Sequence, residues 1–163
     1  MGAAHARGAS PSSFLRDPTV SADALVLAAD HAGFELKDQL ALAARARGLA
    51  VIDLGTKTAE SVDYPDYADR LAAALENGRA ARGVLICGTG IGISIAANRH
   101  RHVRAALCHD VTTARLARLH NDANVLVLGA RVIGLQTALD CMNAFLDTAF
   151  EGGRHSRRVT KLG

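Results

Sequence analysis

The chain has 163 residues, a length typical of one domain, so two independent hydrophobic cores are disfavoured. Apolar residues make up 49% of the sequence and charged residues 21%, a composition that argues against disordered, collagen-like and coiled-coil proteins. The net charge is only +3, and charged residues interrupt every apolar run before it reaches the roughly 18 residues that span a bilayer, so no membrane partner is expected.

The first 20 residues are predicted to be a flexible tail. They are rich in Ala, Ser and Arg, contain Pro11 and Pro18, and lack an apolar run of signal-peptide length. A transit peptide has a similar composition and is the alternative interpretation. Residues 21–163 are then predicted to form a single domain, which ends in the basic segment 151–163.

From residue 24 onward, short apolar runs alternate with segments of helical periodicity. The runs are continuously apolar, as expected for strands that are covered on both faces. In the first helical segment Leu40 lies among the apolar residues of one side and Lys37 among the polar residues of the other, which indicates a helix lying on a sheet. The predicted strands span 24–29, 49–54, 83–87, 103–108 and 125–128. The predicted helices span 34–47, 67–77, 92–99, 111–120 and 135–150.

Five strands that are each followed by a helix predict parallel pairing with right-handed crossovers. The expected fold class is α/β, a three-layer α/β/α sandwich with a five-stranded parallel, Rossmann-like sheet. Ligands of such sheets bind outside the carboxyl ends of the strands, so the residues that follow each strand form the candidate site.

A glycine-rich segment, Cys87-Gly88-Thr89-Gly90-Ile91-Gly92-Ile93-Ser94, leads from the third strand into a helix. Glycines let the backbone turn tightly and bring its amides close to a ligand, and a helix N-terminus favours negative charge. We therefore predict an anion-binding loop. It is no Walker A loop, because the lysine of that motif is absent. A dinucleotide site is an open alternative, with Asp110 as the ribose-binding acid.

The three cysteines cannot all pair, and none belongs to a CxxC motif, so a reducing, cytoplasmic location is expected. Cys87 lies at a predicted helix N-terminus, where amide dipoles stabilise a thiolate that can act as a base or nucleophile. A buried, unreactive thiol is the alternative for Cys87 and the expected state of Cys108 and Cys141.

Two further pairs of residues follow predicted elements. Asp30 and His31 come after the first strand: Asp30 suits a helix N-cap or a functional role, and His31 can donate to an anion or carry a proton. His120 and Asn121 come at the end of the fourth helix. His120 is either a favourable partner of the helix dipole or a general acid-base group.

The basic C-terminal segment follows Gly152 and Gly153, which should end the last long helix. If the segment is helical, Arg154 and Arg158 share a face and can grip a phosphate from two sides, whereas a solvated basic tail is the alternative. Arg131, after the fifth strand, is a third candidate for the same anion. Aromatic residues are only 4% and Trp is absent, so a small anion is expected as ligand rather than nucleic acid.

Five stretches of the chain match one known family in order and cover residues 24 to about 160. They are Asp30-His31-Ala32-Gly33, Asp63-Tyr64-Pro65, the glycine-rich segment from Cys87 to Asn98, His120-Asn121-Asp122 and Glu151-Gly152-Gly153-Arg154-His155. On these residues the chain resembles the type B ribose-5-phosphate isomerase family, which includes galactose-6-phosphate and allose-6-phosphate isomerases. One branch of that family has a glutamate base at the position of Ile93, so this chain resembles the cysteine branch.

The resemblance implies a role for each matching residue. Cys87 would be the base that moves a proton between C1 and C2 of the open-chain sugar, while Thr89 and the loop amides stabilise the enediolate oxygen. His120 would open the furanose ring. Asp30, grouped with the catalytic residues, and Asn121 would hold sugar hydroxyls, and Tyr64 would border the pocket. The phosphate would be bound by His31, Arg131, Arg154 and Arg158. The remaining implied contacts lie in the glycine-rich segment, at Gly88, Gly90, Ile91, Gly92 and Ser94.

The implied reaction interconverts ribose 5-phosphate and ribulose 5-phosphate through a cis-enediolate, as in the pentose phosphate pathway. No metal or redox cofactor is expected, because a base, an oxyanion cradle and a ring-opening acid suffice. The resemblance implies a homodimer, or a tetramer made of two such dimers, in which the partner chain supplies His120, Asn121 and the arginines. A hexose 6-phosphate isomerase and a noncatalytic phosphosugar- or nucleotide-binding module are the alternatives.

Overall fold

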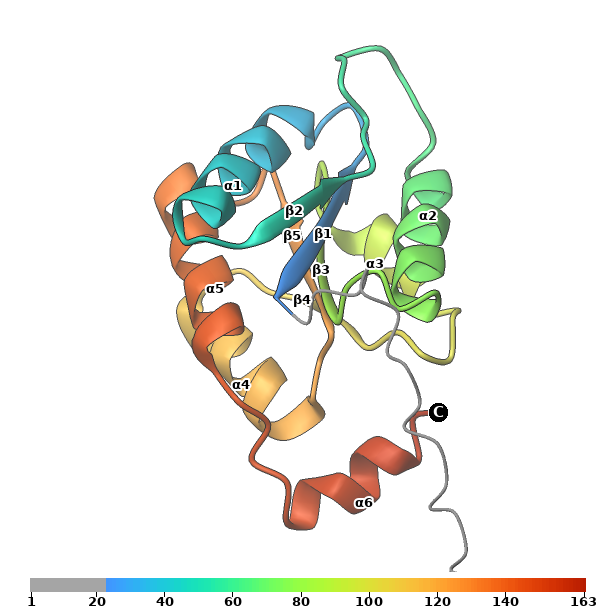
Figure 1. Cartoon of the computed structure of the whole chain (residues 1–163). Helices are drawn as coiled ribbons and strands as arrows, with labels where there is room; N and C mark the ends of the chain where they lie inside the picture. The colour runs from blue at the N-terminus through green and yellow to red at the C-terminus, as the bar shows by residue number, and fades with distance from the viewer. Residues whose placement is uncertain (1–22) are drawn as a thin grey trace, which may run out of the picture.

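The computed structural model describes residues 23–163, so the predicted tail of residues 1–20 lies outside the described part. Five parallel strands form one sheet in the order β2-β1-β3-β5-β4, with helices on both faces (Figure 1). The predicted three-layer α/β/α fold is confirmed. The strands are β1 (Ala24–Ala29), β2 (Ala50–Asp53), β3 (Arg82–Cys87), β4 (Ala105–Leu107) and β5 (Val125–Gly129).

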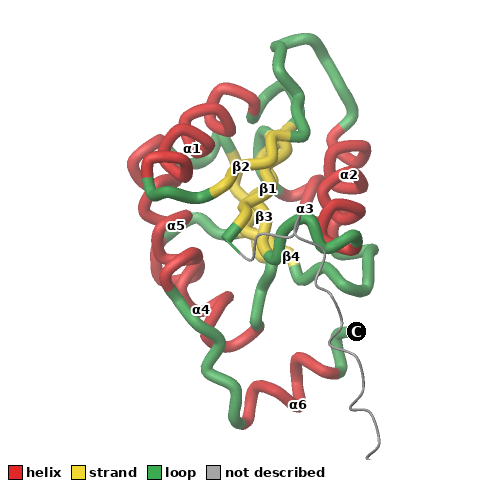
Figure 2. Tube along the Cα trace, viewed as in Figure 1, coloured by secondary structure: helices red, strands yellow, loops and turns green. Residues whose placement is uncertain are grey.

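The helices form the two outer layers. Three of them, α1 (Phe34–Ala46), α4 (Val111–Asn121) and α5 (Leu135–Asp147), pack on one face of the sheet. The other face is covered by α2 (Tyr64–Glu76) and α3 (Ile91–Ala97). A short sixth helix, α6 (Arg154–Thr160), stands apart from both layers and contacts α4 (Figures 1 and 2). No helix of residues 23–163 is long and apolar enough to cross a membrane.

The central strands are buried on both faces, as their continuous apolar sequences predict. In β1, Leu25 and Leu27 pack under α1, α4 and α5, while Val26 and Ala28 pack under α2 and α3. Successive strand residues point to opposite faces, so one strand contributes to both halves of the core. Cys87, the last residue of β3, belongs to the half under α2 and α3.

The strand order places a crevice between β1 and β3. The chain leaves β1 towards α1 on one face and leaves the neighbouring β3 towards α3 on the other. Loops that diverge in this way leave a crevice at the carboxyl ends of the two strands, which is where α/β sheets bind their ligands. The residues after β1 and β3 are therefore the ones that the fold positions for chemistry.

Several predicted boundaries differ from the observed ones, by one to three residues. The second helix begins at Tyr64 rather than at residue 67, because Pro65 suits the first turn of a helix, where its missing N–H needs no partner. The fourth strand begins at Ala105 rather than at residue 103 and is only three residues long. The fifth helix ends at Asp147, not at residue 150.

The prediction that Lys37 lies on the exposed side of the first helix is wrong. Its ammonium group is fully buried and lies 2.7 Å from Oδ2 of Asp53, while Oδ1 of Asp53 accepts from the Gly55 amide at 2.9 Å. Burial by itself would raise the pKa of Asp53, but Lys37 and the Gly55 amide lower it below its usual value. Because Gly55 also bonds the backbone of Ala29, this ion pair holds the loop after β2 against the end of β1.

Candidate active site

The glycine-rich loop folds back on the sulfur atom of Cys87. The Gly90 amide donates to Sγ at 3.1 Å, and Oγ1 of Thr89 accepts from the Ile91 amide at 3.2 Å. Gly90 has a φ of 79°, a left-handed conformation that glycine adopts without strain. A backbone amide aimed at a sulfur atom stabilises negative charge there, so the loop has the arrangement that a thiolate base needs.

The loop is packed too tightly for side chains at its glycines. A Cβ atom on Gly129 would lie 2.5 Å from the carbonyl oxygen of Thr89, and a Cβ atom on Gly88 would lie 3.3 Å from Nη1 of Arg131. The Arg131 guanidinium therefore lies over the loop of its own chain. This corrects the expectation that all the arginines come from a partner chain, since Arg131 follows β5, the strand beside β3.

Replacing Gly90 with alanine is expected to lower both stability and kcat. The left-handed φ costs a residue with a Cβ atom about 1–2 kcal/mol, and the new atom would lie 2.4 Å from Leu107 Cδ1 and 3.1 Å from the carbonyl carbon of Leu128. Gly48→Ala is the matched control, because Gly48 has a φ of 86° and no atom within 4 Å of its Cβ position. Thermal unfolding should show a loss of stability in both variants, and steady-state kinetics a loss of kcat in Gly90→Ala alone. Equal kcat values would contradict the importance of the loop geometry.

Asp30 and His31 line the neighbouring end of β1. Oδ1 of Asp30 accepts from the amides of Ala32 and Gly33 at 2.9 and 3.2 Å, which closes the turn into α1. The N-cap residue of α1 is Gly33, so the alternative of Asp30 as the cap is wrong. Nδ1 of His31 accepts from the Val62 amide at 3.2 Å, and its proton must then lie on Nε2, where it can be donated to a ligand.

Tyr64 and the start of α3 border a cavity of about 340 Å³. Tyr64 is 39% exposed, and a Cβ atom on Gly92 would lie 2.5 Å from its Cζ, so the ring rests on the glycine. The cavity lies between α2 and α3 and is also lined by Arg99. Ser94, in contrast, donates its hydroxyl to the Ile91 carbonyl at 2.7 Å and belongs to the helix rather than to the loop.

The environments of the three cysteines differ. Burial raises the pKa of Cys108 and of Cys141 to about 11, which leaves both thiols protonated near neutral pH. The predicted inert state of these two cysteines fits that environment. Cys87 is 4% exposed in the single chain, but it is the one of the three whose sulfur accepts a hydrogen bond from a glycine-loop amide.

His120 and Asn121 lie at the opposite edge of the sheet from Cys87. They end α4, which starts beyond the carboxyl end of β4 and runs back to the edge where the strands begin. Figure 1 shows α6, the helix that carries Arg154 and Arg158, at this same edge. Since the six residues of β3 span about 20 Å, a pentose phosphate cannot contact Cys87 and His120 of one chain together.

The predicted site residues therefore fall into two groups. The loop half contains Asp30, His31, Tyr64, residues 87–92 and Arg131, which the fold brings together at the carboxyl ends of β1, β3 and β5. The helix half contains His120, Asn121, Arg154 and Arg158 at the other edge. The segment from Arg154 is helical, which is the condition for a shared phosphate face, and both arginines are exposed, one turn apart.

The helix half includes two residues to which the sequence interpretation gave no role. The imidazole ring of His155 stacks on that of His120, with 4.4 Å between centroids and 13° between planes. Oε2 of Glu151 lies 3.7 Å from Nε2 of His120 and 3.5 Å from Nε2 of His155. The spacing of Glu151 and His155 along the chain, four residues apart, was the available signal. His155 faces His120, however, only because α6 folds against α4.

Asp110, the acid of the dinucleotide alternative, caps α4. Its Oδ1 accepts from the Thr113 amide at 2.8 Å, and the Thr113 hydroxyl donates to its carbonyl oxygen. A capping role thus accounts for this aspartate without a ribose ligand.

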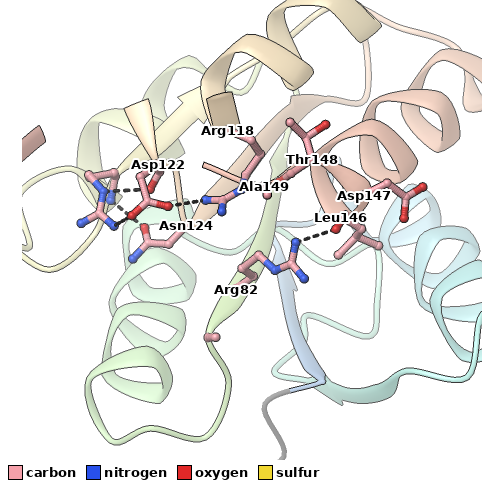
Figure 3. Close-up of a pocket in the computed structure, with 10 residues that line it drawn as sticks. Arg82, Arg118, Asp122, Asn124, Leu146, Asp147, Thr148 and Ala149 are labelled. Carbon is pink, nitrogen blue, oxygen red and sulfur yellow. Dashed lines mark hydrogen bonds and ion pairs between the residues drawn. The ribbon is translucent and has the colours of Figure 1, made fainter. Parts of the chain in front are cut away.

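A cavity of about 500 Å³ lies near the amino end of β3 and contains none of the predicted site residues (Figure 3). Arg118 donates to Asp122 at 2.9 Å, and Arg82 donates to the Leu146 carbonyl at 2.8 Å. Burial, and then the charge of Arg118, lowers the pKa of Arg82. The arginines here hold the ends of α4 and α5 in place, and Arg82 explains why α5 stops at Asp147.

Comparison with known proteins shows to which family the chain belongs. The family model for Ribose/Galactose Isomerase matches residues 25–162. The chain belongs to the ribose/galactose isomerase family. The resemblance stated from the motifs is thus confirmed, and with it the prediction of a sugar phosphate isomerase.

Two curated relatives and one solved structure show the range of this family. Ribose-5-phosphate isomerase B of Escherichia coli is 47% identical over 133 residues, which cover 82% of this chain and 89% of that protein. D-erythrulose-4-phosphate isomerase of Pectobacterium atrosepticum is 44% identical over 140 residues, 85% of this chain and 92% of that protein. The structure of ribose-5-phosphate isomerase B from Clostridium thermocellum has a TM-score of 0.85 at 49% identity, covering 86% of this chain and 95% of that one.

Proposed function

We propose that this family member interconverts ribose 5-phosphate and ribulose 5-phosphate with Cys87 as the base. The observation that carries the proposal is the contact of 3.1 Å between Sγ of Cys87 and the Gly90 amide, inside a loop flanked by His31 and Arg131. The relatives named as ribose-5-phosphate isomerase B support the pentose substrate.

In this mechanism the Cys87 thiolate removes the proton from C2 of open-chain ribose 5-phosphate and returns it to C1. The oxygen atoms gain negative charge as the cis-enediolate forms. We expect the Thr89 hydroxyl and the loop amides to stabilise that charge, other than the amides of Gly90 and Ile91, which already bond Sγ of Cys87 and Oγ1 of Thr89. His31 Nε2–H and the Arg131 guanidinium suit the phosphate group.

The helix half completes the site only in a homodimer. His120 of the partner subunit would open the furanose ring as a general acid-base group, and Asn121 of the partner subunit would hold a sugar hydroxyl. Arg154 and Arg158 of the partner subunit would bind the phosphate. The two halves of one chain lie about 20 Å apart, and a dimer would bring the loop half of one chain next to the helix half of the other.

The substrate class is tested by assaying the purified protein without added metal on ribose 5-phosphate and allose 6-phosphate. We expect ketose formation from the pentose, at a kcat/KM at least about fivefold higher than from the hexose, because a mismatch in pocket length costs at least about 1 kcal/mol. The reverse preference would support the hexose alternative. No turnover of either sugar, with retained binding, would support a noncatalytic module. Erythrulose 4-phosphate belongs in the same panel, since one relative is named for it.

Arg154→Ala and Arg158→Ala are each expected to raise KM for ribose 5-phosphate by about 10- to 150-fold, while kcat falls less. Each change removes a charge-assisted contact worth about 1.5–3 kcal/mol. Arg157 lies on the same helix but outside this i, i+4 pair, so Arg157→Ala is the matched control for loss of charge. Steady-state kinetics at fixed ionic strength gives the measurement. An equal rise in KM for all three variants would indicate general electrostatic attraction instead of specific phosphate contacts.

A further inference from the structure

Three side chains of metal-binding type meet where α6 packs against the end of α4. His120, Glu151 and His155 place their ligand atoms within 4.8 Å of one another. The Glu151 amide donates to the Leu119 carbonyl at 3.1 Å, which ties the segment before α6 to α4. The cluster is therefore built by the fold of a single chain.

His155 is the fixed member of the cluster and lacks a hydrogen-bond partner. The residue is 6% exposed, and its Nε2 is a buried side-chain polar atom that no described group satisfies. The nearest oxygen in the cluster, Oε2 of Glu151, lies 3.5 Å away at ion-pair distance. Leaving a buried polar atom unpaired costs about 1–3 kcal/mol, so a ligand at this atom would regain free energy.

Two of the three ligand-atom spacings are close to those of a zinc centre, and all three lie within 4.8 Å. Tetrahedral zinc has bonds of about 2.0–2.2 Å to nitrogen and oxygen, which places its ligand atoms about 3.3 Å apart. The observed Nε2–Oε2 distances are 3.5 and 3.7 Å. One imidazole must also rotate out of the stack, because in-plane lone pairs of nearly parallel rings cannot meet at one ion. His120 and Glu151 have side chains 37% and 55% exposed, so they are free to move towards the fixed His155.

We infer that His120, Glu151 and His155 form a binding site for a divalent transition metal ion of the zinc class. Two imidazoles and one carboxylate suit such ions, whereas calcium and magnesium prefer oxygen ligands alone. The positive charges of Arg154 and Arg158 lie close by and weaken the attraction for a cation. The affinity should therefore be lower than that of a structural zinc centre, and binding should be reversible by chelation.

A bound ion would occupy Nε2 of His120 and withdraw it from ring opening. This consequence, which rests on the proposed function, makes the cluster an inhibitory site: metal binding lowers isomerase activity and chelation restores it. Metal binding itself does not depend on the reaction, so the two claims can be tested separately.

The binding test is a titration of the untagged full-length protein with Co²⁺, followed by visible absorption, and with Zn²⁺, followed by calorimetry. We expect one ion per chain and visible bands without the near-ultraviolet band of a cobalt–thiolate bond. Glu151→Gln and His155→Phe should each weaken binding by at least about tenfold, the smallest loss seen even for outer-shell groups. The His155→Phe variant keeps an aromatic ring that can stack on His120 but has no nitrogen atom to bind a metal. His109→Ala, an exposed histidine outside the cluster, should bind as the wild type does.

Absence of binding, a thiolate band, or unchanged affinity in Glu151→Gln would overturn the metal site and leave the isomerase proposal intact. In the activity arm, the rate with saturating Zn²⁺ is divided by the rate with chelator for each variant, so differences in basal rate cancel. We expect this ratio to be low for the wild type and near one for Glu151→Gln. Equal ratios in the two proteins would overturn the link to His120, while the binding data would still decide the site.

Discussion

Cys87→Ala is expected to lower kcat on ribose 5-phosphate by about 10²- to 10⁴-fold, the usual contribution of a general base. Binding of the sugar phosphate should change little, because the proposed phosphate contacts, His31 and the arginines, are untouched. Kinetics gives kcat, and calorimetry with the inactive variant gives the dissociation constant. A loss of binding with unchanged kcat would reverse the proposed role.

Cys141→Ala is the matched control for this change. It removes the same sulfur atom from a fully buried position in α5, on the face of the sheet away from α2 and α3. We expect a loss of about 1 kcal/mol in stability from the small cavity, and no loss of kcat. Alkylation adds a second readout: Cys87 should be modified first and ribose 5-phosphate should protect it, since burial raises the pKa of Cys108 and Cys141 to about 11.

A mixture of two inactive variants, Cys87→Ala and His120→Ala, is expected to regain about a quarter of wild-type activity after subunit exchange. Random pairing makes about half of the dimers mixed, and each mixed dimer has one site with both residues intact. The reason lies in the fold: Cys87 ends β3 at one edge of the sheet, and His120 ends α4 at the other.

The two variants are measured alone, mixed, and mixed after co-refolding, with the protein concentration held constant. A mixture of Cys87→Ala with Thr89→Ala is the control, because both residues belong to the loop half and neither chain can supply an intact one. Recovery in the control as well would indicate residual activity of Thr89→Ala. No recovery in the test mixture would show that each chain carries its own complete site, against the proposed dimer.

The loop half could be predicted from the sequence because each of its segments directly follows a strand. Continuous apolar runs identified β1 and β3, and the carboxyl ends of neighbouring parallel strands meet at one edge. Cys87 and His31 were therefore expected together, and the structure places both there. The conformation of the loop was also predictable in kind, since three glycines in six residues leave few alternatives to a tight turn.

Two features depend on contacts between distant segments and were missed or misplaced. The periodicity of the first helix put Lys37 on its polar side. Asp53, sixteen residues later, pairs with the ammonium group, and this ion pair offsets the cost of removing the charge from water. The stacking of His155 on His120 follows from the docking of α6 onto α4, and no local pattern encodes that docking.

The sequence by itself determined the fold class and the family and supplied the candidate reactive residues, because hydrophobic periodicity and glycine-rich turns are local properties of the chain. Only the tertiary structure decided which of those residues share a site. The return of α4 across the sheet carries His120 about 20 Å from Cys87, and the packing of α6 sets His155 beside it. Such distances depend on how layers pack, and a linear pattern of residue types does not contain them.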